Sequence, residues 1–137
     1  MISTSLARAL RDSGLTWRPS AGDAFRIDRV EADDEVYILS DMTVEAHDYG
    51  TGVILGFNGT TEWALDSVAL EDALWMPHEH QLRQFLAGTF RSLTATAGPV
   101  VEIEIEGKTH SFGSDDAANA YARAALYLLD SLAVQGP

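Results

Sequence analysis

The 137-residue chain predicts an α+β fold in a single domain, residues 1–137. Its composition, with 46% hydrophobic and 22% charged residues, is typical of a globular domain that buries a core. Short strand-like segments follow one another with connections too brief for parallel crossovers, which predicts antiparallel neighbours. Apolar residues at helical spacing near both ends predict flanking helices. The predicted order is an N-terminal helix, an antiparallel meander of about five strands, a helical segment, a β-hairpin and a C-terminal helix packed on the sheet.

The first helix is expected from Ser5 to Asp12. Its apolar side chains Leu6, Ala7 and Leu10 fall on one face, as they do in an amphipathic helix. Gly14 follows at the position where helices commonly end, because glycine adopts the left-handed conformation without strain.

The five strands of the meander are expected in the segment that follows this helix. They are rich in Val, Ile, Tyr and Phe, which favour extended conformations. The predicted segments are Ala24–Val30, Glu35–Ser40, Thr43–His47, Gly52–Phe57 and Thr61–Leu65. Asn58-Gly59 lies between the last two and is the strongest short signal for a two-residue hairpin turn. That turn would place Ile54 opposite Trp63.

A helical region is expected after Asp66 or Ser67, in two pieces. The first piece carries the apolar residues Val68, Leu70, Leu74 and Trp75. Pro77 fits the first turn of the second piece, where Glu79 lies near the positive end of the helix dipole. The apolar stripe of this second helix comprises Leu82, Phe85, Leu86, Phe90 and Leu93. Gly88 interrupts the stripe, and glycine disfavours helix.

The clearest pattern is the alternation in "VEIEIEGKTHSF", which predicts a β-hairpin with one apolar and one polar face. Its apolar members in the first strand are Val101, Ile103 and Ile105, which alternate with glutamates. A two-residue turn at either Glu106-Gly107 or Gly107-Lys108 leaves this alternation unchanged. In both cases His110 and Phe112 fall on the apolar face.

The last helix is expected to begin after Ser114, Asp115 and Asp116, since such residues cap a helix and suit its dipole. One side of the helix carries Ala117, Tyr121, Ala124, Ala125, Leu128 and Leu132, and the other side carries Leu126, Tyr127 and Leu129. A helix that is apolar on both sides is either buried on most sides or in contact with another subunit.

The net charge of −12, from 21 acidic and 9 basic side chains, disfavours binding to nucleic acid or to an anionic membrane. The expected macromolecular partner is a protein with a basic surface, or a second copy in a homodimer. The chain has no cysteine, no apolar run of about 20 residues and no secretory signal pattern at its start, so a cytoplasmic location is expected.

No cofactor is expected, because each motif that suggests one is incomplete. Gly107-Lys108-Thr109 matches the end of a P-loop, but Glu102 stands where the first glycine is required. His78 and His80 are weak candidates for metal ligands. In a helix, residues two apart point to nearly opposite sides, and in an extended loop the pair would still need a third ligand.

Four residues are candidates for a binding site: Trp63, Trp75, His110 and Tyr121. His110 is the most specific of them, because it falls among apolar neighbours and would act as a general base beside Tyr121 or Asp116. A buried histidine with a hydrogen-bond partner and no catalytic role is the alternative interpretation. No nucleophile is predicted next to it, and no catalytic residue is assigned.

The segments "GLTWRPSAGDAFRI", "DDEVYILSDMTVEAHDYGTGVILGFNGTTEWALDSV" and "ALWMPHEHQL" cover about the first two-thirds of the chain. Their succession resembles a family of small acidic actinobacterial proteins that often carry the name of CpaE-type pilus-assembly proteins. That name implies an ATPase of the MinD group. The chain departs from this pattern because it has no complete P-loop and is too short for a doubly wound nucleotide-binding domain.

The sequence therefore predicts a non-enzymatic protein-interaction or adaptor domain that acts through apolar surfaces, either on another protein or on a second copy in a homodimer. The alternative is a small-molecule or hydrolytic pocket between the sheet and the last helix, with His110 and Tyr121 in its wall.

Overall fold

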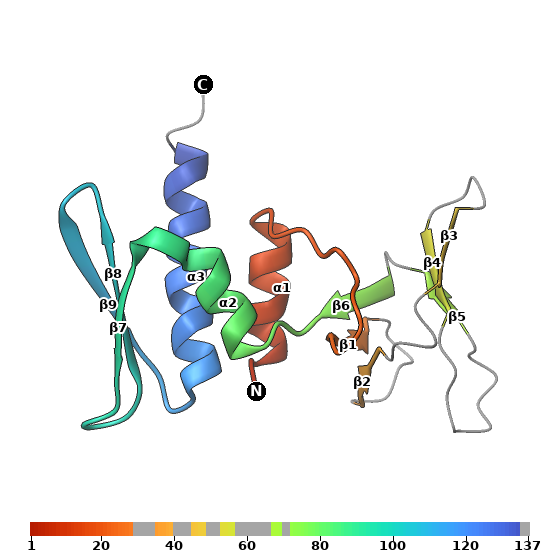
Figure 1. Cartoon of the computed structure of the whole chain (residues 1–137), viewed down its shortest axis with the longest axis horizontal. Helices are drawn as coiled ribbons and strands as arrows, with labels where there is room; N and C mark the ends of the chain where they lie inside the picture. The colour runs from red at the N-terminus through yellow and green to blue at the C-terminus, as the bar shows by residue number, and fades with distance from the viewer. Residues whose placement is uncertain (29–34, 40–44, 49–52, 57–66, 70–71, 135–137) are drawn as a thin grey trace. The chain divides into compact units, whose positions relative to one another are not determined.

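The computed structural model describes residues 1–28, 35–39, 45–48, 53–56, 67–69 and 72–134 (Figure 1). The chain forms two compact units. We call Met1–Thr16 together with Pro77–Pro137 the terminal unit, and Trp17–Met76 the central unit. The helices and the antiparallel sheets confirm the predicted α+β class. Among the described residues, no helix combines the length and the apolar character needed to span a membrane.

The terminal unit contains the α-helices of the described residues and one antiparallel sheet in the order β7-β8-β9. Its elements are α1 (Thr4–Asp12), α2 (Glu79–Leu86), the 3-10 helix η2 (Ala87–Thr89), β7 (Phe90–Thr94), β8 (Val100–Ile105), β9 (Lys108–Gly113) and α3 (Ala117–Val134). The central unit contains two antiparallel sheets, in the orders β2-β1-β6 and β3-β4-β5. Its strands are β1 (Ala24–Ile27), β2 (Val36–Ile38), β3 (Glu45–Asp48), β4 (Val53–Gly56), β5 (Ser67–Ala69) and β6 (Ala73–Trp75).

Helix α3 is the core of the terminal unit, because it packs against β8 and β9 on one side and against α1 and α2 on the other (Figure 1). Its small side chains Ala118, Ala120, Ala122, Ala124 and Ala125 are all buried. Small residues let the neighbouring elements approach closely. At the start of α1, the Ser3 amide donates a hydrogen bond of 2.7 Å to the Asn119 side chain. The helix is therefore buried on most sides from Ala118 to Ala125, whereas Tyr127 and Leu132, nearer its C-terminal end, are exposed.

The predicted hairpin is confirmed with its turn at Glu106-Gly107. Ile105 pairs with Lys108 across the turn, so the loop has two residues. Both loop residues have positive φ, 52° at Glu106 and 78° at Gly107, as a type I′ turn requires. Farther along, Ile103 pairs with His110 and Val101 pairs with Phe112. His110 and Phe112 therefore share a face with Val101 and Ile103, which are fully buried beneath α3.

The prediction of a helical region after Asp66 is wrong for its first piece, and the predicted second helix is longer than the helix in the structure. Residues 67–69 and 73–75 form strands β5 and β6, since pairing with β4 and β1 outweighs their helical spacing. Helix α2 begins at Glu79, close to the expected start, and ends at Leu86. Ala87 then adopts a positive φ of 48°, and Phe90 and Leu93 lie in β7.

The four expected strands that the structure describes, which correspond to β1, β2, β3 and β4, are divided between the two sheets of the central unit. In the described residues, Ile54 pairs with His47 on one side and with Ala69 on the other. Trp63 itself, the Asn58-Gly59 turn and the expected strand Thr61–Leu65 lie outside the described residues.

Candidate functional site

The candidate site is a group of three aromatic rings where α3 crosses β9. The His110 ring lies 4.6 Å from the Tyr127 ring, and the Phe112 ring lies 5.5 Å from it. His110 and Phe112 are half-buried, whereas Tyr127 is 39% exposed. One turn earlier on α3, the Arg123 guanidinium donates a hydrogen bond to the Gly113 carbonyl oxygen. This bond links α3 to the end of β9.

The structure does not bring His110 and Tyr121 together, because each ring has a different partner. Tyr121 is buried and stacks on Phe90, with 5.9 Å between ring centroids. Phe90 pairs with Ile103, and Ile103 pairs with His110 on its other side. Phe90 and His110 thus lie on opposite edge strands, about 10 Å apart. The wall predicted for a pocket is not assembled from these two residues.

Asp116 is also engaged elsewhere, at the start of α3. Its carboxylate accepts hydrogen bonds from the Ala118 amide at 2.7 Å and from the Met1 ammonium at 2.9 Å. The Met1 ammonium is the largest cause that lowers the pKa of Asp116; burial acts in the opposite direction, and the Ala118 amide lowers it further. The carboxylate is therefore a helix cap and an ion-pair partner, not a base beside His110.

Replacing Asp116 by alanine is expected to lower the free energy of unfolding by about 1 kcal/mol at neutral pH, because α3 loses its cap. A carboxylate whose folded pKa is depressed stabilises the fold above its unfolded pKa of about 3.9, and that contribution disappears as pH falls through the lower folded pKa. The difference between Asp116→Ala and the natural chain should therefore shrink below about pH 4. Urea denaturation at several pH values measures it. Asp130→Ala, which removes an exposed aspartate farther along α3, is the control and should change little; equal loss in both variants would contradict the capping role.

The rings of His78, which precedes α2, and of His80, in its first turn, come together, contrary to the expectation for two residues in a helix. The His78 and His80 rings stack 5.6 Å apart with an interplanar angle of 14°. They can do so because His78 precedes the helix in an extended conformation, with φ −74° and ψ 162°, and its amide donates to the Gln81 side chain at 2.9 Å. Within the described residues, no group of three or more His, Cys, Asp or Glu side chains is placed to hold a metal ion.

Trp75, another candidate, belongs to an aromatic cluster in the central unit. Trp17 stacks on Trp75 at 6.4 Å and lies 5.7 Å from Phe25. The Trp17 indole N–H donates to Oδ2 of the buried Asp23 at 2.9 Å. Among the described residues, the Trp75 indole nitrogen is buried and has no hydrogen-bond partner. Trp17 and Trp75 are half-buried, and their stacked rings lie next to the fully buried Phe25.

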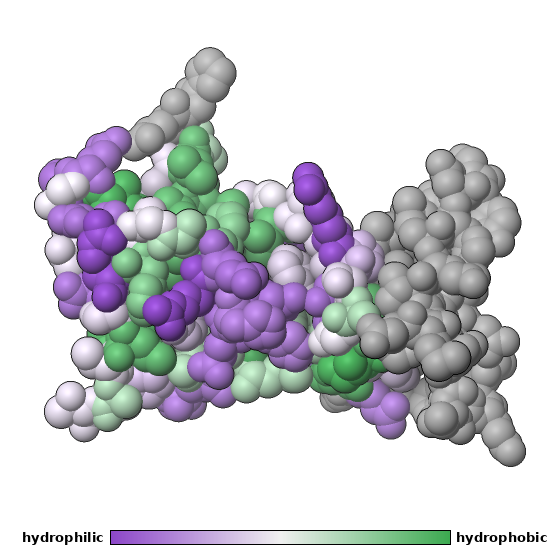
Figure 2. All heavy atoms as spheres, viewed as in Figure 1, coloured by the Kyte–Doolittle hydropathy of each residue, from purple (hydrophilic) through white to green (hydrophobic). Residues whose placement is uncertain are grey.

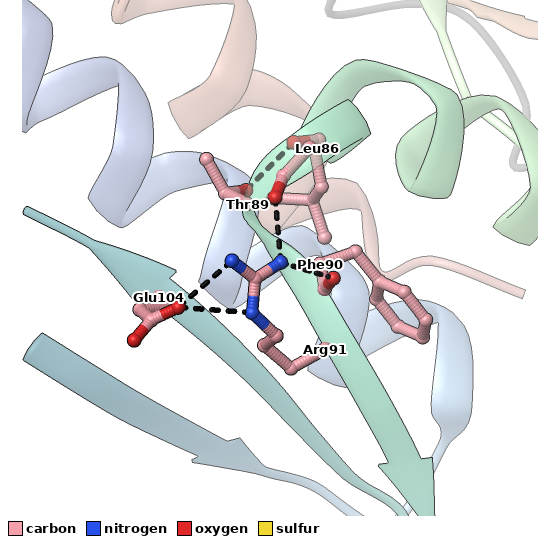
Figure 3. A network of polar contacts seen from close by, with 6 residues as sticks. Leu86, Thr89, Phe90, Arg91 and Glu104 are labelled. Atoms are coloured by element: carbon pink, nitrogen blue, oxygen red, sulfur yellow. Dashed lines mark hydrogen bonds and ion pairs between the residues drawn. The ribbon is translucent and has the colours of Figure 1, made fainter. Parts of the chain in front are cut away.

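The opposite edge of the terminal sheet is held by Arg91, a residue that sequence reasoning missed. Its guanidinium donates to the Glu104 carboxylate at 3.0 and 2.8 Å, and to the carbonyl oxygens of Gly88 and Phe90 at 2.7 and 3.1 Å (Figure 3). The register of β7 shifts between Phe90 and Ser92, directly at this arginine. The alternation of glutamates in β8 gives no signal for this bulge, because the bulge belongs to the neighbouring strand.

Apolar surface remains exposed on the terminal unit. In Figure 2 it gathers over the C-terminal half of α3, next to the β8–β9 hairpin. Its large exposed side chains include Tyr127 and, near the end of the helix, Leu132, which is 56% exposed. Comparison with protein-family models, with curated proteins and with solved structures yields no match to this chain.

Proposed function

We propose that this chain is a non-enzymatic protein-interaction domain, located in the cytoplasm, that binds through the apolar surface around Tyr127. The observation that carries the proposal is the position of this side chain. It is 39% exposed, yet its inner part rests on the rings of His110 and Phe112. Single exposed apolar residues are common on any protein. Tyrosine, however, is one of the residue types that dominate the binding energy of protein interfaces.

The arrangement of the polar candidates favours binding over chemistry. His110 faces an aromatic ring, Asp116 caps α3, and Tyr121 stacks on Phe90, which also lies 4.3 Å from the Arg83 guanidinium. Catalysis by proton transfer needs an acid or base within hydrogen-bond reach of a shared substrate. These groups are committed to separate structural contacts. The net charge of −12 makes the expected partner either a protein with a basic surface or a second copy that approaches where acidic side chains are absent.

Tyr127→Asp tests the proposal. This variant should weaken partner binding at least about tenfold, since a charge would have to be desolvated at the centre of the contact. Binding is measured for self-association by sedimentation, and for other proteins by quantitative capture from a cytoplasmic extract. Ala133→Asp is the matched control, because Ala133 is exposed on the same helix and receives the same charge.

Thermal unfolding followed by circular dichroism must show that both variants remain folded. If the natural chain neither self-associates nor captures a protein, the proposal fails. It also fails if Tyr127→Asp and Ala133→Asp bind equally.

A further inference from the structure

We propose that β9 is the pairing edge of a homodimer, in which two copies join antiparallel through Lys108–Phe112 and His110 lies opposite the partner's His110. The inference rests on the proposed function and specifies both its partner and its geometry. In the part of the chain that the structure describes, β9 pairs with β8 alone, so its other side is an open edge. Such an edge presents backbone donors and acceptors that another strand can use.

The register of the hairpin identifies which backbone groups point outward. The pair that flanks a two-residue turn exchanges both of its hydrogen bonds, and here that pair is Ile105 and Lys108. Because bonded and non-bonded pairs alternate, His110 and Phe112 also bond to β8. Thr109 and Ser111 therefore direct their N–H and C=O groups away from the sheet. Both residues are exposed.

Two features define the part of β9 that can pair with a second copy, and therefore its central residue. Gly113 has the same outward parity as Thr109 and Ser111, and its carbonyl oxygen already accepts the Arg123 guanidinium. At the other end, Gly107 belongs to the turn. The remaining segment, Lys108–Phe112, is centred on His110. A twofold axis at His110 pairs Thr109 with the partner's Ser111, so that outward groups meet outward groups.

The segment is self-complementary in its side chains. Its sequence, "KTHSF", contains none of the 21 acidic residues of this chain, so two copies can approach here without opposing carboxylates. On the polar face, the Thr109 hydroxyl lies beside the partner's Ser111. On the apolar face, Lys108 lies opposite the partner's Phe112 instead of another lysine.

The apolar face would continue across the junction. Paired strands lie about 4.8 Å apart, so His110 and Phe112 would meet their counterparts directly. Helix α3 covers the same face, and Tyr127 stands over β9 with 39% of its surface exposed. The partner's rings would cover this remaining surface. The exposed part of Tyr127 is therefore a reason for a second copy as the partner and for β9 as the place of contact.

The other edge strand of the sheet, β7, is less suited to pairing with a second copy. The register shift between Phe90 and Ser92 breaks the regularity of β7, and Arg91 bonds to the Gly88 and Phe90 carbonyl oxygens beside it (Figure 3). Bulges of this kind protect edge strands from pairing. By contrast, β9 pairs with β8 without any irregularity from Lys108 to Gly113.

Ser111→Pro tests the pairing in the full-length chain. Proline removes an N–H that the sheet does not use, and proline is tolerated on an edge strand at such a position. The natural chain should form dimers as its concentration rises from about 1 to about 300 µM in sedimentation experiments, and Ser111→Pro should raise the dimer dissociation constant at least about tenfold. Ser111→Ala keeps the N–H and should dimerise like the natural chain. Circular dichroism at low concentration checks that each variant is folded.

Amide hydrogen exchange gives a second measurement that does not depend on the proline. The Thr109 and Ser111 amides should become protected as concentration rises, whereas the Leu93 amide, which points outward from β7, should not. Dimers that survive Ser111→Pro but not Tyr127→Asp would overturn the β9 pairing and leave the proposed function standing. A natural chain that stays monomeric yet captures another protein would also overturn the β9 pairing and leave the proposed function standing. A natural chain that neither dimerises nor captures another protein would overturn both the β9 pairing and the proposed function.

Discussion

Replacing Phe25 by alanine is expected to destabilise the central unit by about 3–5 kcal/mol. Phe25 is completely buried in the middle strand of its sheet, and its ring lies 5.7 Å from the Trp17 ring and 5.6 Å from the Tyr37 ring. The substitution removes a large apolar side chain and leaves a cavity that these rings cannot refill without shifting. Tryptophan fluorescence during urea denaturation measures the loss, because Trp17 and Trp75 stack within the same cluster.

Phe25→Leu is the graded control for this prediction. Leucine keeps most of the buried apolar volume but loses the ring contacts, so its loss of stability should be clearly smaller. Losses of equal size for leucine and alanine would show that the aromatic contacts, and not burial, determine the effect. A loss below about 1 kcal/mol for alanine would contradict the buried position of the side chain.

The second large effect is expected at Ile103, where alanine should cost the terminal unit about 2–5 kcal/mol. Ile103 lies in the central strand β8, is fully buried, and has Phe90 and His110 as its two cross-strand neighbours. The buried residues of α3, which packs on β8, are mostly alanines, and such short side chains fill a cavity poorly. Far-UV circular dichroism follows the unfolding, because the helices of the described residues belong to this unit.

Two further substitutions serve as controls for the prediction at Ile103. Ile103→Val removes a single methylene and should cost about 0.5–1.5 kcal/mol. Glu102→Ala changes the next residue, on the polar face of the same strand, and should stay within about 0.5 kcal/mol. If Glu102→Ala destabilised the unit as much as Ile103→Ala, the assignment of the two faces of β8 would be wrong.

The elements that the sequence predicts well are those whose signals are local. Alternating residues from Val101 to Phe112 specify a hairpin face by themselves, and the structure confirms the parity at His110. Strands β5 and β6 resemble helix in the sequence because their three residues each are too short to establish a period. Their conformation is set by pairing with β4 and β1, which no local pattern reveals.

The partner of His110 cannot be read from the sequence for a different reason. Helix α3 is apolar on both sides, so its rotation about its own axis has no polar stripe to fix it. Tyr121 and Tyr127 are six residues apart, which turns them about 240° around the helix. Only the packing decides that Tyr127 faces β9 while Tyr121 faces Phe90. The sequence places His110 on the apolar face, and the packing places Tyr127 instead of Tyr121 beside it.

The two-unit division of the chain has a consequence for its synthesis on the ribosome. The central unit is one continuous stretch and emerges whole, whereas α1 must wait for α3, its packing partner more than a hundred residues downstream. At about 5–20 residues per second, that delay is about 5 to 20 s. During this time the faces of Ala7 and Leu10, buried in the finished protein, have no native neighbour on α3. Helix α1 is thus completed by α3, and nascent chains halted before α3 should be the species that chaperones retain.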